Sequence, residues 1–80
     1  MAYPNPSVNT IYFELGIPEE GDVLLEIYDL KGQLIKSVFD GRMAKGTKHI
    51  SYQLEDLKAG SYMVKLTTDD EVLSQQVIKQ

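Results

Sequence analysis

The sequence predicts an all-β chain, an antiparallel β-sandwich of six to seven short strands. Segments in which apolar and polar residues alternate recur along the chain, and turn-forming residues separate them at intervals of about 8 to 12 residues. No segment between Ile11 and Gln80 carries an apolar stripe at helical spacing that is long enough for a helix. Cysteine is absent, so an apolar core must hold the fold, rather than disulfides or a thiolate metal site.

The first long strand is predicted at residues 11–15. Apolar and polar side chains alternate there, which is the period of a half-buried strand, and the inward row is Ile11, Phe13 and Leu15. Two glycines and a proline within residues 16–21 then indicate a break in the strand.

A central strand and a hairpin are predicted next. The inward row of residues 22–28 is Val23, Leu25 and Ile27. The opposite side also holds apolar residues, so we expect this strand inside a sheet or covered on its outer side. Residues 29–32 predict a hairpin turn, because Asp29 can bond the backbone ahead of it and Gly32 tolerates a positive φ.

The remaining strands are less regular. In residues 33–39 the apolar side chains fall on both sides, so we expect a bulge, and the pattern leaves open which set is buried. Glycines at 41 and 46 bracket an expected loop that holds a short extended piece. Further strands are predicted at 49–52, at 62–67 and in a segment that ends at 77–78, with a polar turn over 68–71.

Residues 57–62 sharpen the fold prediction. Leu57, Gly60 and Tyr62 stand just before a strand at the spacing of a tyrosine corner, in which the tyrosine hydroxyl bonds a backbone group a few residues upstream. In this interpretation Gly60 allows a close approach of the chain and Leu57 closes the open end of the core. The alternative is that Tyr62 is only a buried strand aromatic. We favour the corner, which makes the predicted sandwich immunoglobulin-like.

Size and charge limit the classes of function. Eighty residues form a single domain, 1–80, because so short a chain cannot supply two cores. Eight Lys and Arg against twelve Asp and Glu give a net charge of −4, which disfavours nucleic acid as a partner. The longest apolar runs, such as residues 23–25, are too short to span a bilayer, so we expect no transmembrane segment.

No group of residues indicates catalysis, and we predict that the chain is not an enzyme. His49 is the only histidine, and no motif supplies the nucleophile and the carboxylate that a catalytic base needs beside it. The acidic runs 19–22 and 69–71 lack the spaced carboxylates and glycine pivot of a calcium loop. Solvated turn residues are the favoured interpretation, with calcium as the alternative, and we expect no metal and no cofactor.

Exposed aromatic residues offer another functional surface. Tyr12 and Tyr28 fall on the outward phase of their strands, where they can be neighbours across a sheet and stack on a sugar ring. A cross-strand pair that only stabilises the sheet is the commoner arrangement. The alternative functions are therefore a carbohydrate-binding module or an immunoglobulin-like spacer of an extracellular protein.

Four motifs occur together and in order. Residues 3–6 read YPNP, residues 27–32 read IYDLKG, residues 57–66 read LKAGSYMVKL, and residues 77–79 read VIK. With this set the chain resembles, from Tyr3 to Lys79, the C-terminal sorting domain of the type IX (Por) secretion system in its type A form. It departs from that pattern in lacking a glycine soon after YPNP, in Tyr52 where tryptophan is frequent, and in Gln80 after the terminal lysine.

The resemblance implies a function. Domains of this kind are non-catalytic C-terminal signals that direct a covalently linked, N-terminal cargo protein across the outer membrane. The cargo is in the periplasm in transit and then reaches the cell surface or the extracellular space, where a surface cysteine peptidase removes the domain. The implied partners are the components of the type IX translocon and that peptidase.

The resemblance also implies roles for single residues. The resemblance assigns translocon recognition to Val77, Ile78 and Lys79. We expect the translocon to bind the exposed edge of the last strand by strand addition, in which a partner segment adds a strand to the sheet. The other matching residues are mainly structural: the prolines fix an extended start with few backbone donors, and the turn residues shape the hairpin and the corner. This structural set is Tyr3, Pro4, Asn5, Pro6, Asp29, Gly32, Leu57, Gly60 and Tyr62.

Overall fold

The computed structural model describes residues 1–4 and 9–80, so Asn5 and Pro6 of the YPNP motif lie outside the described residues. The described residues form no helix, and the prediction of an all-β fold is confirmed. None of them builds a helix that is long and apolar enough to cross a membrane. The strands are β1 (Ala2–Tyr3), β2 (Thr10–Ile17), β3 (Gly21–Asp29), β4 (Leu34–Met43), β5 (Gly46–Gln53), β6 (Gly60–Thr67) and β7 (Val72–Lys79).

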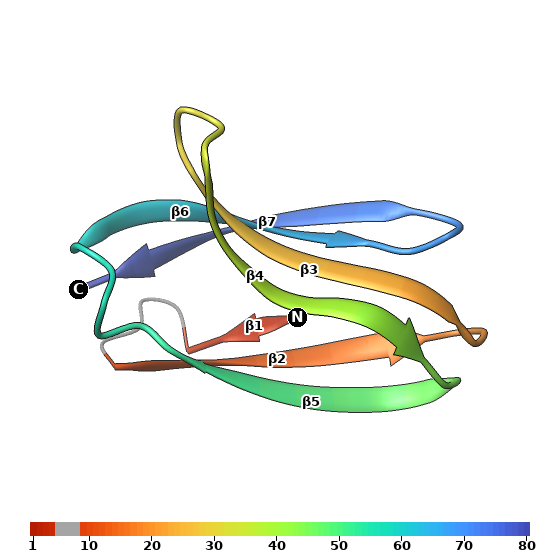
Figure 1. Cartoon of the computed structure of the whole chain (residues 1–80). Helices are drawn as coiled ribbons and strands as arrows, with labels where there is room; N and C mark the ends of the chain where they lie inside the picture. The colour runs from red at the N-terminus through yellow and green to blue at the C-terminus, as the bar shows by residue number, and fades with distance from the viewer. Residues whose placement is uncertain (5–8) are drawn as a thin grey trace.

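Two antiparallel sheets pack face to face as a sandwich (Figure 1). The three-stranded sheet has the order β1-β2-β5, and the four-stranded sheet has the order β4-β3-β6-β7. Because β3 lies between β4 and β6, the expected position of this strand inside a sheet is confirmed. The turns after β2, β4 and β6 lie at one end of the sandwich, at the right of Figure 1.

The core lies between the sheets and is built from alternating residues of the long strands. Both predicted inward rows, in β2 and in β3, are buried. Strand β6 adds Val64 and Leu66, and β7 adds Val77. Every second side chain of each of these strands therefore points into the core, and both sheets contribute to it. This is the arrangement that the alternating sequence predicts.

Two strand boundaries differ from the prediction. Strand β2 continues to Ile17, whose side chain is buried, so the turn is confined to residues 18–20. Strand β4 continues to Met43 through the expected loop, because residues 40 and 41 pair with β3. In both places the burial of an apolar side chain and the pairing with a neighbouring strand outweigh the local turn preference of glycine.

The predicted irregularity of β4 is confirmed, and it occurs twice. The residues of β4 that are skipped at the two register shifts are Ile35 and Val38. Neither of the two apolar sets, Leu34 with Val38 or Ile35 with Phe39, is buried as a whole. Val38 and Phe39 pack against the core, whereas Leu34 and Ile35 are exposed. Bulges bend a strand and increase its twist, so the far end of the β3–β4 hairpin turns away from the core.

Replacing Leu25 by Ala is expected to lower the free energy of unfolding by about 2–5 kcal/mol, because the side chain is fully buried. The matched variant Leu34→Ala removes the same atoms from a side chain that is 53% exposed and should change the stability by less than about 0.5 kcal/mol. Chemical denaturation followed by circular dichroism measures both. Equal losses in the two variants would contradict the assignment of the core.

Candidate recognition surface

The register of the four-stranded sheet brings three of the sequence motifs together. Asp29 of β3 pairs with Tyr62 of β6, and Tyr62 pairs with Val77 of β7. Directly opposed residues of an antiparallel pair point to the same side, so the three motifs meet in one row across the sheet. The next pairs of the β6–β7 hairpin are Ser61 with Ile78 and Gly60 with Lys79. This end of the sandwich, at the left of Figure 1, also holds the C-terminus.

The predicted tyrosine corner is confirmed. The Tyr62 hydroxyl donates a hydrogen bond to the carbonyl oxygen of Lys58 at 2.5 Å, four residues upstream. Leu57 packs half-buried against the core, as expected of the residue that closes its end. The role predicted for Gly60 is corrected: a Cβ there would meet no atom within 4 Å, whereas its φ of +151° disfavours other residues. Backbone conformation, not a close approach, requires this glycine.

The predicted hairpin turn at residues 29–32 is confirmed. The Asp29 carboxylate accepts hydrogen bonds from the backbone N–H groups of Lys31 and Gln33, both at 2.9 Å. The N–H of Gly32 donates to the carbonyl of Asp29 at 3.1 Å, and the φ of Gly32 is +86°. One aspartate thus satisfies the donors of the turn, and one glycine supplies the left-handed conformation that closes it.

The three residues predicted for translocon recognition differ in exposure. Val77 is only 4% exposed, because its side chain belongs to the core. Ile78 is 42% exposed, and Lys79 is half-buried. In the folded domain a partner can therefore contact the side chains of Ile78 and Lys79, while Val77 contributes by holding β7 in the sandwich.

A contact that sequence reasoning missed ties the two ends of the chain together. The backbone N–H of Ala2 donates to the side-chain oxygen of Gln75 at 3.1 Å, and the amide nitrogen of Gln75 donates to the Ala2 carbonyl at 3.2 Å. The Gln75 amide thus joins β1 of one sheet to β7 of the other. No sequence signal marks this pair, since its partners are 73 residues apart and neither belongs to a recognisable motif.

The prediction that Tyr12 and Tyr28 are neighbours across a sheet is wrong. Tyr12 and Tyr28 do face outward, but they lie in different sheets and therefore on opposite faces of the sandwich. Tyr12 stacks instead on Tyr3, its partner in the β1–β2 register, with ring centroids 5.7 Å apart and an interplanar angle of 27°. Tyr3 of the YPNP motif thereby anchors β1, and it is followed by a cis peptide bond to Pro4.

Two tyrosines have raised pKa values. The hydrogen bond from the Tyr28 hydroxyl to Glu26, at 2.8 Å, together with desolvation and the Glu26 charge, raises the pKa of Tyr28 above 10.0. Burial, with a smaller effect of the Asp56 carboxylate, raises the pKa of Tyr52. Tyr52, at the position where the family frequently has tryptophan, packs half-buried against the core. Both hydroxyls therefore stay protonated at neutral pH.

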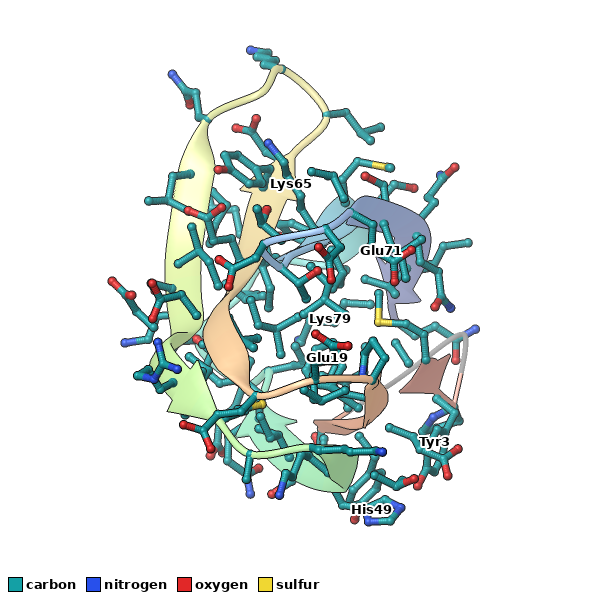
Figure 2. The ribbon with its side chains drawn as sticks, turned by 90° about the vertical axis from the view of Figure 1, so that its right-hand side faces the viewer. Tyr3, Glu19, His49, Lys65, Glu71 and Lys79 are labelled. Carbon is teal, nitrogen blue, oxygen red and sulfur yellow. The ribbon has the colours of Figure 1, made fainter. Side chains whose placement is uncertain are left out.

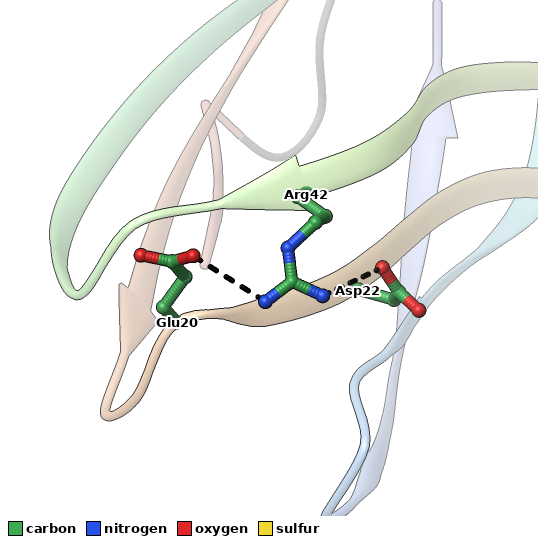
Figure 3. A network of polar contacts seen from close by, with 3 residues as sticks. All are labelled: Glu20, Asp22 and Arg42. Carbon is green, nitrogen blue, oxygen red and sulfur yellow. Dashed lines mark hydrogen bonds and ion pairs between the residues drawn. The ribbon is translucent and has the colours of Figure 1, made fainter.

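The acidic runs 19–22 and 69–71 meet at the opposite end of the sandwich, where both contribute residues to a hollow of about 90 Å³. The Arg42 guanidinium lies 3.3 Å from a carboxylate oxygen of Glu20 and 3.4 Å from one of Asp22 (Figure 3). All three side chains are largely exposed, so water screens these ion pairs. Within residues 1–4 and 9–80, no three His, Cys, Asp or Glu side chains gather at a distance suited to one metal ion.

The expected exposure of His49 is confirmed. Its side chain is 65% exposed on the outer side of the three-stranded sheet (Figure 2). Its Nε2 lies 3.6 Å from a carboxylate oxygen of Glu14, the residue opposite it in the β2–β5 register. This arrangement is a cross-strand surface pair in open water.

The two-sheet architecture and the tyrosine corner define an immunoglobulin-like β-sandwich. A family model described as the secretion system C-terminal sorting domain matches residues 1–80, and the chain belongs to this family. Among curated proteins the chain has no significant match. Membership implies a type IX secretion signal that leads to the cell surface or the exterior, and the family resemblance inferred from the four motifs is confirmed.

Replacing Tyr62 by Phe is expected to lower the free energy of unfolding by about 0.5–1.5 kcal/mol, because it removes the hydrogen bond to Lys58 and keeps the ring. The control Tyr12→Phe keeps the stacking on Tyr3 and should change the stability by less than about 0.5 kcal/mol. Urea denaturation of both variants gives the comparison. A Tyr62→Phe variant as stable as the control would mean that the corner bond does not stabilise the fold.

Replacing Gly32 by Ala is expected to cost about 1–2 kcal/mol, because its φ of +86° is strained for a residue with a Cβ. Asn should cost less at this position, since it tolerates the left-handed region. Gly16→Ala is the control, because neither a positive φ nor a nearby atom opposes a Cβ there. Thermal denaturation should rank the Gly32 variants with Asn above Ala; the reverse order would contradict a backbone origin of the cost.

Proposed function

We propose that the chain is a non-catalytic C-terminal sorting domain that directs a covalently attached N-terminal cargo protein across the outer membrane through the type IX secretion system. The single observation that carries this proposal is the match of residues 1–80 to the family. The domain spans residues 1–80 of a larger cargo protein. It passes through the periplasm in transit and is removed at the cell surface by a cysteine peptidase.

The geometry of the titratable residues supports a non-catalytic role. The side chain of the only histidine is exposed beside a surface carboxylate, rather than in a cleft next to a nucleophile. The acidic end of the sandwich carries ion pairs with Arg42 on an open surface. Such a domain acts as a ligand of the secretion machinery.

The surface around Ile78 and Lys79 is the proposed recognition site of the terminal motif. Both residues lie on β7, an outermost strand of the four-stranded sheet, opposite Ser61 and Gly60 of the corner motif. Successive side chains of a strand point to opposite sides, so Ile78 offers an exposed apolar surface on the outer side of the sheet and Lys79 offers a charge on the side of Val77. Recognition by strand addition to β7 stays a prediction.

An export assay in a bacterium with a type IX system tests this function. The chain is fused behind a fluorescent reporter that carries a signal peptide, and fluorescence is measured at the surface, in the medium and in the periplasm. Deletion of residues 75–80 is a poor probe by itself, because it also removes Val77 from the core and Gln75 from its contact with Ala2. The sharper variant is Ile78→Ser with Lys79→Ser, and Val72→Ser, at the other end of β7, is its control.

The full fusion and the Val72→Ser control should be exported, and the Ile78→Ser, Lys79→Ser variant should accumulate in the periplasm. Circular dichroism of the purified domains verifies that each variant is folded. Retention of the unsubstituted, folded fusion in the periplasm would reject the sorting function and leave a spacer. Export of the double variant at the level of the control would reject Ile78 and Lys79 as recognition residues and leave the sorting function standing.

A further inference from the structure

The β3–β4 hairpin projects beyond the rest of the sandwich (Figure 1). Its tip and second strand expose three large apolar side chains: Leu30 is 62% exposed, Leu34 53% and Ile35 39%. Because water contact with such side chains is unfavourable, apolar residues gathered on one projection indicate a protein contact rather than a solvated turn. These three side chains do not belong to the core, and the roles confirmed for the sequence motifs do not require apolar residues at these positions.

A hollow of about 360 Å³ lies at the base of the hairpin, on the outer side of the four-stranded sheet. Its wall combines the hairpin with β6 and β7, and it includes Tyr28, Leu30, Gly32, Met63, Lys65 and Ser74. Lys65 lies near the base of the hairpin on this outer side (Figure 2). We call this surface, together with the exposed residues 30–36, the hairpin face.

Contacts within the chain hold the turn and the base of the hairpin face in place. The Asp29 carboxylate holds the turn through two backbone hydrogen bonds. At the base, the Tyr28 hydroxyl donates to the largely buried Glu26, and the Lys65 ammonium lies 5.8 Å from the centre of the Tyr28 ring. A turn whose backbone is already held by such bonds loses less conformational freedom on binding, so more of the contact energy appears as affinity.

The charge of the hairpin face differs from that of the whole chain. The chain has a net charge of −4, but this face carries three lysines, Lys31, Lys36 and Lys65, against one carboxylate that lines it, Asp29. A second carboxylate, the largely buried Glu26, lies opposite Lys65 in the β3–β6 register. None of these three ammonium groups lies within ion-pair distance of a carboxylate among the described residues. The acidic turns at 18–22 and 68–71 lie at the right-hand end of Figure 1, away from the hairpin. Lysines therefore outnumber the carboxylates on this face, and an excess of positive charge around an apolar projection matches a partner that is itself apolar and acidic.

We propose that the hairpin face is a docking surface on which a protein of the secretion machinery binds this domain. The partner offers an apolar depression for Leu30 and Leu34 and carboxylates for Lys31, Lys36 and Lys65. This inference rests on the proposed sorting function and adds a second contact region to the terminal residues 78 and 79. Hydrophobic insertion supplies the affinity, and the lysines orient the partner and speed its approach.

The same export assay tests the docking surface with two variants and two matched controls. Leu30→Ser with Leu34→Ser removes the apolar contact, and Val72→Ser with Leu73→Ser makes the same chemical change at similarly exposed positions on β7. Lys31→Glu with Lys36→Glu reverses the charge of the hairpin, and Lys45→Glu with Lys48→Glu makes the same change in total charge at the opposite end. Circular dichroism and thermal denaturation verify that each domain is folded.

We expect the apolar hairpin variant to lower the exported fraction at least about tenfold, as the loss of a buried anchor does at protein interfaces. The charge-reversal variant should lower it severalfold, whereas both controls should be exported like the unsubstituted fusion. Export of both folded hairpin variants at the control level would overturn the docking surface and leave the sorting function intact. Retention of the unsubstituted fusion would overturn the sorting function itself. If the apolar variant does not fold, the charge-reversal variant alone tests the docking surface.

Sedimentation of the purified chain over a range of concentrations supplies a second measurement. A monomer at all concentrations agrees with a surface that is kept for another protein. A dimer that dissociates in the Leu30→Ser, Leu34→Ser variant would instead mean that a second copy of this chain covers the hairpin face, and that outcome would overturn the proposal.

Discussion

The pairing of β6 with its two neighbours, β3 and β7, determines the geometry of the whole four-stranded sheet. Side chains alternate along a strand, so a slip of one residue in either pairing would exchange the buried and exposed rows. The observed register places Val64 and Leu66 in the core and aligns Tyr62 with Asp29 and Val77. The tyrosine corner, the hairpin turn and the C-terminal strand are thus three parts of one arrangement, although the sequence separates them widely.

The parts of the fold that follow from local chemistry could be predicted from the sequence. The alternation in β2 and β3 predicts which side is buried, because one row is uniformly apolar. Asp29 and Gly32 predict their turn, and residues 57–62 predict the corner, since each depends on contacts within a few residues. The extent of β2 and β4 was not predictable in this way. Each strand contains a glycine that by itself indicates a break, and only pairing with another strand keeps the chain extended there.

Features that depend on which strands share a sheet could not be predicted from the sequence. Alternation indicates that Tyr12 and Tyr28 face outward, but it does not say that the two outward faces belong to different sheets. The contact of Gln75 with Ala2 depends on the approach of two strands from different sheets, which no pattern within either strand encodes. The exposure of Ile78 beside the buried Val77 follows from the alternation in β7 once the register is known.

The connection of β1 to β7 has a mechanical consequence. Strand β1 has two residues, pairs with β2 at two positions, and contributes only Ala2 to the core. A force that pulls on the chain ahead of residue 1 would first load the hydrogen bond from the Glu14 N–H to the Met1 carbonyl, at 2.7 Å, then this short ladder and the two hydrogen bonds of the Gln75 amide. Those contacts would separate while the rows of β2, β3 and β6 stayed packed. A force on the N-terminus is therefore expected to detach β1 before it disturbs β6 and β7, the strands that carry the corner and the terminal motif.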